Sequence, residues 1–276
     1  MPVERILIWG KTYPELSKKY GEVVCTAGCR EDGTPIRLYP VPLRYLPAFG
    51  KYSLYNWIEV NVERNTTDVR PESYKVVGMP RVVGEMDSKQ NWAARRELLF
   101  KNPAWHYPCA VDLRAAQQAA KTSLGVIKVG QVERIWVVER PADELRKHRA
   151  LMQALKSRLK LFDEPQMRDL DPQEFKVHLQ WRCAHPDCPG GHTAGIMDWG
   201  LAQLGRKKGR EAAVSRMREL SDLTKHDLHL LMGNFAKHQG NFGIIGMWYP
   251  QTAEYLASKA SPKRKPRPAQ QLGLDL

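Results

Sequence analysis

The sequence predicts an α+β fold. We expect a β-rich N-terminal half, built as a small barrel or twisted sheet, and a helical C-terminal half with two strands and a zinc-like Cys/His loop. Short β-branched or alternating runs, separated by Gly and Pro, dominate residues 1–140. Longer runs with helical spacing dominate residues 141–258. Residues 259–276 are rich in Pro, Lys and Arg, which predicts a disordered basic tail.

In the N-terminal half, Asp32 and Gly33 separate two β-rich runs, which predicts a hairpin because glycine supplies the positive φ of a tight turn. Residues 55–62 alternate apolar and polar side chains, as a half-buried strand does. We expect further strands at 4–10, 73–77 and 81–83, helices at 88–100 and 112–121, and a second hairpin or strand pair at 123–138, with Val129 and Gly130 between its strands.

In the C-terminal half, Pro141 suits the first turn of a helix over residues 141–160. The basic residues of this helix, Arg149 among them, form either a solvated face or a phosphate-contacting one. An alternating run predicts a strand at 174–181. Helices are expected at 195–204, 211–220, 224–236 and 252–258, with a strand at 241–249.

Charge is the unusual feature of the composition. Lys and Arg number 43 against 30 Asp and Glu, a formal charge of +13. A protein this basic usually meets an anionic partner, most often nucleic acid. Five cysteines at irregular spacing do not predict a disulfide scaffold. The N-terminus lacks a signal-peptide pattern and no run approaches about 20 apolar residues, so we expect a cytoplasmic protein without a membrane partner.

One stretch gathers side chains that bind transition metals. Cys183, His185, Cys188 and His192 lie within ten residues of Pro- and Gly-rich chain that must turn tightly. Their spacing is typical of zinc loops, although His185 is too close to Cys183 for both to bind easily. The alternative is a surface loop with incidental thiols. A fourth ligand could come from Cys109, Cys25, Cys29, His226, His229 or His238.

The same region permits a catalytic interpretation. His192 and Asp198 could act as base and orienting acid, or could bind Mg²⁺ or Mn²⁺ in a nuclease. No carboxylate spacing here is diagnostic of such a site. The sequence contains no Walker motif, nucleophile elbow or dinucleotide-binding glycine motif. It therefore does not decide between a binding protein and an enzyme.

A basic cluster follows the Cys/His loop at Arg206, Lys207, Lys208 and Arg210. Grouped cations of this kind are what contacts to nucleic-acid phosphates require. Phosphate contacts alone supply affinity without sequence recognition.

The chain ends in a glutamine followed by spaced leucines: Gln271, Leu272, Leu274 and Leu276. This peptide resembles the hexapeptide motif by which bacterial replication and repair proteins bind the DNA sliding clamp. Its place after a flexible basic linker suits such a tether. The alternative is a chain end without a partner, and the rest of the chain resembles no family that we can identify.

These features together predict a DNA-associated protein of bacterial genome maintenance, such as DNA repair, or of antiviral defence. It would bind DNA through its basic surface and be recruited by the sliding clamp. The alternatives are a metal-dependent nuclease acting on DNA and an RNA-binding protein whose β-rich half is a small barrel.

Overall fold

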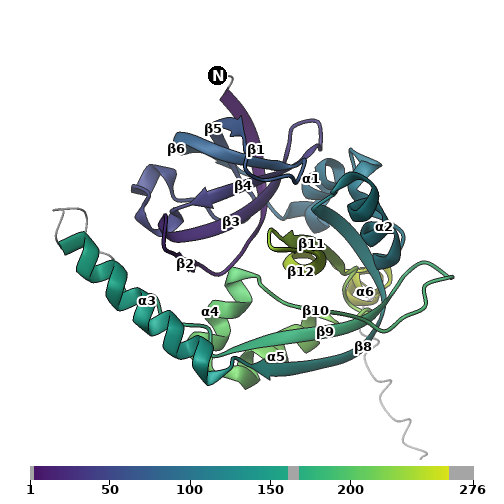
Figure 1. The fold of residues 1–276 in the computed structure, drawn as a ribbon. Coiled ribbons are helices and arrows are strands. Elements are labelled where there is room, and N and C mark those ends of the chain that lie inside the picture. Colours follow the sequence, from purple (N-terminus) through teal and green to yellow (C-terminus); the bar gives the residue numbers. More distant parts are fainter. Residues whose placement is uncertain (1–2, 161–167, 261–276) are drawn as a thin grey trace, which may run out of the picture.

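The computed structural model describes residues 3–160 and 168–260. Its N-terminal half is a small barrel, drawn in purple and blue in Figure 1, with the strand order β1-β5-β6-β4-β3. The sheet closes because β3 also pairs with β1, and β2 extends it along β3. Its strands are β1 (Val3–Lys11), β2 (Glu15–Ser17), β3 (Gly21–Arg30), β4 (Pro35–Val41), β5 (Asn56–Arg64) and β6 (Ser73–Glu85).

A second sheet with the order β10-β9-β8-β11-β12 lies beside the barrel, and the short β7 pairs with β8. Its strands are β7 (His106–Tyr107), β8 (Leu124–Glu139), β9 (Phe175–Cys183), β10 (His192–Gly195), β11 (His229–Phe235) and β12 (His238–Trp248). The helices are α1 (Lys89–Leu99), α2 (Ala110–Ala120), α3 (Ala142–Lys160), α4 (Trp199–Lys208), α5 (Arg210–Leu220) and α6 (Ala253–Ala260). Single 3-10 turns form η1 (Leu43–Tyr45), η2 (Ala48–Gly50) and η3 (Pro103–Trp105).

Strand β1 joins the two sheets. Ile6 and Ile8 point into the barrel core, whereas Leu7 and Trp9 belong to a second core that includes residues of β8, β11 and β12. Both faces of the strand are buried, which accounts for its continuous apolar run. The backbones of β1 and β12 also approach closely, since a Cβ at Gly10 would lie 2.7 Å from the carbonyl oxygen of Ile245.

The α+β class, the β-rich N-terminal half and the helical C-terminal half are confirmed. The small barrel is the form that the first sheet takes, and its predicted hairpin at Asp32–Gly33 joins β3 to β4. The predicted strands at 73–77 and 81–83 are parts of one strand, β6. The predicted boundary near residue 140 stays a prediction, although β8 on one side of it pairs with β9 on the other.

The expected hairpin at 123–138 is wrong, because β8 is one continuous strand. Its first part, Leu124 to Lys128, pairs with β11. The rest pairs with β9, with a register shift between Val129 and Gln131. Gly130 therefore marks an irregularity where β8 changes partner, and a Cβ there would lie 2.8 Å from Cα of Ala184.

The expected helix at 224–236 is also wrong, and the C-terminal half contains four strands rather than two. Residues 229–235 form β11, which pairs with β8 on one side and β12 on the other. Leu228, Leu231 and Phe235 have helical spacing, but β11 is a central strand in which successive residues are buried on both faces. Periodicity cannot separate such a strand from a buried helix.

The helix expected at 195–204 begins four residues later, at Trp199. Residues 192–195 form β10, and Asp198 caps α4 by accepting a hydrogen bond from the amide of Leu201 at 2.8 Å. Arg206, Lys207 and Lys208 form the last turn of α4 instead of interrupting it. The break lies at Gly209, whose φ of 86° favours glycine.

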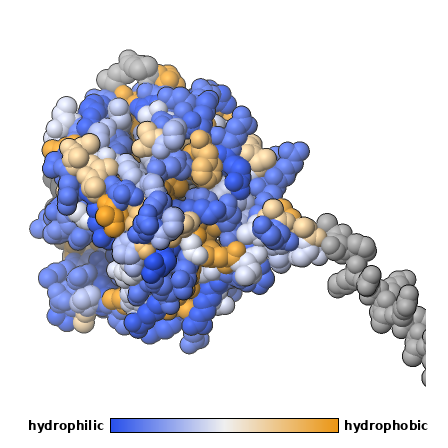
Figure 2. All heavy atoms as spheres, turned by 90° about the vertical axis from the view of Figure 1, so that its right-hand side faces the viewer, coloured by the Kyte–Doolittle hydropathy of each residue, from blue (hydrophilic) through white to orange (hydrophobic). Residues whose placement is uncertain are grey.

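Hydrophilic side chains dominate the face in Figure 2, where apolar side chains form only small, separate patches. Among the described residues, no helix combines the length and apolar character needed to cross a membrane.

Candidate metal centre and arginine-lined cavity

Four buried side chains converge on one point. Cys109, Cys183, Cys188 and His192 each place one potential ligand atom within 4.8 Å of the others. Cys109 Sγ lies 3.5 Å from Cys188 Sγ, and His192 Nε2 lies 3.3 Å and 3.2 Å from these two sulfurs. These four side chains could hold a metal ion.

The β9–β10 hairpin supplies three of the four ligands. Cys183 ends β9 and His192 begins β10, where it lies opposite Trp181. Gly190 and Gly191 have φ values of 73° and 68°, so the loop needs glycine to return the chain.

Two charged side chains fix the shape of this loop. The Glu133 carboxylate accepts a hydrogen bond from the amide of Gly191 at 3.0 Å. The Arg182 guanidinium donates to the carbonyl oxygen of Cys188. The loop is therefore held from β8 and β9, the strands on which these two side chains lie.

Helix α2 supplies the fourth ligand. Cys109 is its N-cap residue, and Asp112 accepts a hydrogen bond from the Cys109 amide at 3.0 Å. Burial raises the pKa of Cys183 and of Cys109, and the backbone amides of Ala110 and Val111, in the first turn, oppose this rise. Amides at a helix N-terminus stabilise negative charge, so they favour the thiolate form that binds metals.

Hydrogen bonds and burial oppose each other at the thiols. Burial opposes ionisation of Cys188, but backbone amides of Gly190 and Cys183 lower its pKa, the latter from 3.1 Å. Burial raises the pKa of Cys183 to about 12 and also raises that of Cys109. Burial lowers the pKa of His192, which favours the neutral imidazole that binds a metal.

The donor set fits a tetrahedral soft-metal site. In such a site, bonds of about 2.0–2.3 Å place neighbouring ligand atoms about 3.5–3.8 Å apart. The distances of 3.2–3.5 Å among the ligand atoms of Cys109, Cys188 and His192 are close to that spacing, and all four atoms lie within 4.8 Å of one another. Three thiols and one imidazole with no carboxylate are typical of closed structural sites, in which no position is left for substrate.

The other predicted ligands lie elsewhere. His185 is exposed on the loop, 4.0 Å from the Asp187 carboxylate, and does not join the four. Cys25 accepts a hydrogen bond from Arg37, and Cys29, on β3, is buried in the core that the barrel shares with the second sheet. His226, His229 and His238 lie on or before the β11–β12 hairpin, outside the cluster.

His192 and Asp198 do not form a catalytic pair through any contact among the described residues. Asp198 is buried and caps α4. Burial raises the pKa of this carboxyl, while the nearby Lys11 opposes the shift. His192 Nε2 faces two cysteine sulfurs instead. The observed role of Asp198 is structural.

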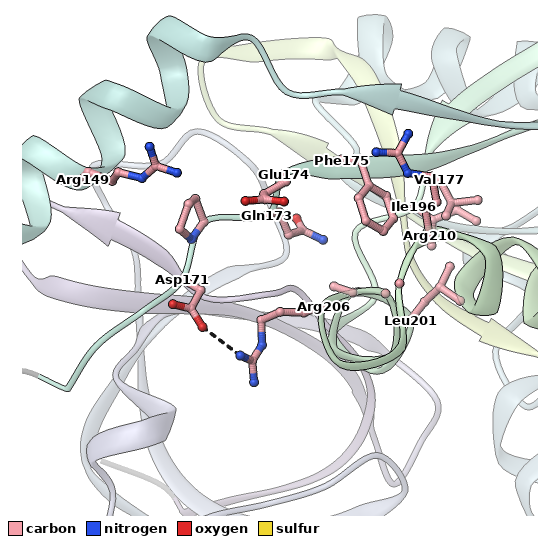
Figure 3. Close-up of a pocket in the computed structure, with 14 residues that line it drawn as sticks. Arg149, Asp171, Gln173, Glu174, Phe175, Val177, Ile196, Leu201, Arg206 and Arg210 are labelled. Carbon is pink, nitrogen blue, oxygen red and sulfur yellow. Dashed lines mark hydrogen bonds and ion pairs between the residues drawn. The ribbon is translucent and has the colours of Figure 1, made fainter.

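The predicted basic cluster borders a cavity of about 520 Å³. Arg206 and Arg210 line it from α4 and α5, and Arg149 lines it from α3 (Figure 3). Arg206 pairs with Asp171 at 2.8 Å and Arg210 with Glu139 at 2.6 Å. Lys207 and Lys208 are exposed beside the cavity. The sequence placed Arg149 only on a basic helix face, because nothing local indicates that this helix faces α4.

Residues 106–268 match a family described as Domain of unknown function (DUF8757). Residues 2–101 match a second, described as Domain of unknown function (DUF8758). The match to residues 2–101 contains the barrel strands and α1. The match to residues 106–268 contains all four residues of the candidate metal centre. A comparison with curated proteins gives no match.

Proposed function

The chain belongs to the family described as Domain of unknown function (DUF8757), and we propose that it binds DNA. The cations around the cavity between α3, α4 and α5 form the binding surface. The observation that carries this proposal is the grouping of Arg149, Arg206 and Arg210 on one cavity, with Lys207 and Lys208 beside it. Planar guanidinium groups and flexible ammonium groups are the usual partners of phosphate oxygens.

The ion pairs of the cavity do not prevent phosphate binding. The side chains of Arg206 and Asp171 are 37% and 65% exposed, and those of Arg210 and Glu139 are 59% and 55% exposed. Exposed pairs contribute little free energy and exchange partners readily. Lys207, Lys208 and Arg149 have no carboxylate partner within residues 3–160 and 168–260, so their charges are available to a DNA backbone.

The metal of the Cys/His centre is proposed to be zinc with a structural role. A buried site of three cysteines and one histidine is a common zinc donor set. The centre joins the N-terminus of α2 to the β9–β10 hairpin, and α4 follows β10 after three residues. Zinc would therefore hold α2 and the β9–β10 hairpin together and so fix the position of α4 and its cationic C-terminal end.

The C-terminal peptide completes the proposal. Gln271, Leu272, Leu274 and Leu276 lie outside the described residues. We propose that they bind the sliding clamp, so that the tail supplies recruitment and the cavity supplies DNA contacts. A cytoplasmic role in genome maintenance or antiviral defence fits such a protein.

The proposal is tested by DNA affinity. Fluorescence anisotropy with duplex DNA, single-stranded DNA and RNA, at fixed salt, compares the wild type with a Lys207→Gln/Lys208→Gln variant. We expect the variant to bind duplex DNA about tenfold more weakly, because each lost phosphate contact removes counterion release. Tighter binding of RNA than of DNA would favour the RNA-binding alternative, and cleavage of the probe with Mg²⁺ or Mn²⁺ would favour the nuclease.

The matched control removes two lysines from other elements. Lys51 follows η2 and Lys121 caps the end of α2, and both are exposed. The Lys51→Gln/Lys121→Gln variant loses the same net charge and is expected to keep most of the DNA affinity. Equal losses in the two variants would show that only net charge matters and would contradict a site at α4.

A further inference from the structure

A second cavity, of about 370 Å³, lies between the barrel and the second sheet. The barrel contributes Arg37 and Tyr39 of β4 and Cys25 of β3. The second sheet contributes Asn234 and the turn between β11 and β12. This cavity therefore lies between the two family regions and shares no lining residue with the metal centre or the cavity at α4.

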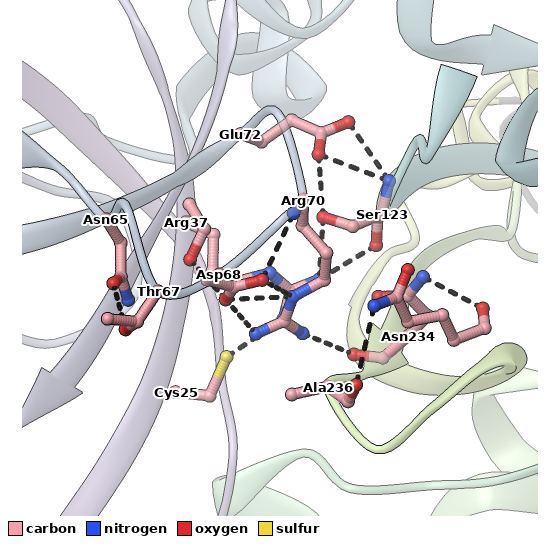
Figure 4. A network of polar contacts seen from close by, with 12 residues as sticks. Cys25, Arg37, Asn65, Thr67, Asp68, Arg70, Glu72, Ser123, Asn234 and Ala236 are labelled. Atoms are coloured by element: carbon pink, nitrogen blue, oxygen red, sulfur yellow. Dashed lines mark hydrogen bonds and ion pairs between the residues drawn. The ribbon is translucent and has the colours of Figure 1, made fainter.

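Arg37 is a buried cation that contacts no carboxylate of the described residues. It is only 2% exposed, and its guanidinium donates to Cys25 Sγ at 3.0 Å and to the carbonyl oxygen of Ser123 at 2.8 Å (Figure 4). Within the part of the chain that the structure describes, its Nε has no hydrogen-bond partner. Of the two acids in this network, Glu72 accepts hydrogen bonds from Ser123 and Asp68 accepts them from Arg70.

The neighbouring arginine, Arg70, has the carboxylate partner that a buried arginine usually has. Arg70 also lines the cavity and is 4% exposed, but Asp68 accepts hydrogen bonds from its Nε and from a terminal nitrogen. Burying a charge is costly unless the charge is paired. Arg37 lacks such a pair among the described residues, so a negative group within the cavity would supply what Asp68 supplies to Arg70.

A second buried polar atom, Asn234 Oδ1, needs a hydrogen-bond donor, whereas Arg37 needs an acceptor. Asn234 is 4% exposed, and its Nδ2 donates to the carbonyl oxygen of Gln239 at 2.9 Å. Its Oδ1 accepts no hydrogen bond from residues 3–160 or 168–260. A ligand that satisfies both residues must carry an anion and a hydrogen-bond donor.

The volume and the lining residues of the cavity limit the kinds of ligand that it can bind. A volume of 370 Å³ lies within the range of about 300–1,000 Å³ that is usual for small-ligand sites, well beyond an inorganic ion. Tyr39, Phe235 and Ile245 offer apolar surface, and Lys237 and His238 lie at the exposed turn. Glu15 is the carboxylate that lines the cavity, and it is exposed.

From these contacts we infer that the cavity binds a nucleotide unit, with its phosphate at Arg37 and an amine or hydroxyl donor at Asn234 Oδ1. The unit is either a free mononucleotide or the phosphorylated end of a strand. Both present the same phosphate, flat aromatic base and hydrogen-bond donors.

The test is isothermal titration of the full chain with AMP, GMP, CMP and dTMP, with adenosine and inorganic phosphate as partial ligands. We expect saturable binding of at least one mononucleotide and weaker binding of adenosine. A 5′-phosphorylated oligonucleotide, compared with its unphosphorylated form, distinguishes a strand end from a free nucleotide. No saturable binding of any phosphate-bearing probe up to about 5 mM, or equal binding of adenosine, would overturn the inference.

Three variants locate the site. Arg37→Met is expected to weaken binding about tenfold to a hundredfold, since a charge-assisted hydrogen bond is lost. Lys237→Glu, on the exposed turn, tests the same cavity without touching the core and is expected to cost about threefold to tenfold. Lys207→Glu makes the same charge change at α4 and is expected to stay within about twofold. If Arg37→Met does not fold, Lys237→Glu decides, and wild-type affinity in that variant would contradict the site.

Since the DNA-binding test uses Lys207 and Lys208, the two proposals can fail separately. Loss of DNA affinity in Lys207→Gln/Lys208→Gln with normal mononucleotide binding would leave both intact. Loss of mononucleotide binding in Lys207→Glu but not in Lys237→Glu would move the nucleotide to the α4 cavity and overturn the inference.

Discussion

His229 is a buried imidazole that contacts the rings of Phe100 and Trp248 and lies 3.6 Å from the Asp227 carboxylate. Burial lowers its pKa to about 4, although Asp227 opposes the shift. In the unfolded chain the pKa of a histidine is about 6.5. Between these two values the unfolded chain binds the proton and the folded protein does not, so acid favours unfolding.

We therefore expect the free energy of unfolding to fall as the pH drops from 7 to 4, with a contribution from His229 of up to about 1.4 kcal/mol per pH unit. Urea unfolding at several pH values measures this slope. His229→Gln should flatten it, whereas His185→Gln, at an exposed histidine, should not. An unchanged slope in His229→Gln would show that other groups set the acid sensitivity.

Cys109 shows which part of the site the sequence could predict. Cys183, Cys188 and His192 were recognisable because they lie within one short loop. Cys109, 79 residues before Cys188, was one of six candidates for the fourth ligand. Only the packing of α2 against the second sheet selects it, and no local pattern encodes that contact. His185 was predicted from proximity along the chain, but its side chain points to solvent.

At the level of single elements, the best-predicted strands have one buried face or a clear turn, as in β5 and the β3–β4 hairpin. The errors fall where a strand is buried on both faces or changes its partner strand. β11 is paired on both sides, so its leucines have no alternation that would reveal a strand. In β8 the glycine that suggested a turn instead marks the change of partner strand. Both features depend on neighbours that are distant in sequence.

Helix α4 depends on its cap. Asp198→Ala removes the acceptor for the Leu201 amide, so we expect the free energy of unfolding to fall by about 1–2 kcal/mol in thermal or chemical unfolding. Asp198→Asn keeps an acceptor and avoids burying a charge, so it should be close to the wild type. An Asn variant as unstable as the Ala variant would show that the carboxylate has a role beyond capping.

At the scale of the whole molecule, the barrel and the second sheet share a core through β1, β8, β11 and β12. The two matched regions, 2–101 and 106–268, are therefore packed together rather than joined only by the chain. This packing creates the cavity at Arg37, which neither region forms alone. The sequence predicted the class of each half, but it did not indicate how the two halves meet.

The C-terminal peptide is expected to act as a separable tether. A chain ending at Ala269 should keep its fold and its intrinsic DNA affinity but lose retention on immobilised sliding clamp. Leu272→Ala/Leu274→Ala should have the same effect, since the leucines would fill an apolar pocket. Equal retention of the full and shortened chains would contradict the tail proposal and leave the DNA proposal standing.

The proposed structural zinc site is tested most directly by its metal content. The site joins α2 to the hairpin that leads into α4. Native mass spectrometry, with elemental analysis of the same sample, gives metal identity and stoichiometry. We predict one zinc ion per folded chain, its loss in Cys109→Ser, and its retention in the control Cys25→Ser, whose thiol contacts Arg37 instead. A folded, metal-free wild type, or full zinc content in Cys109→Ser, would contradict the centre.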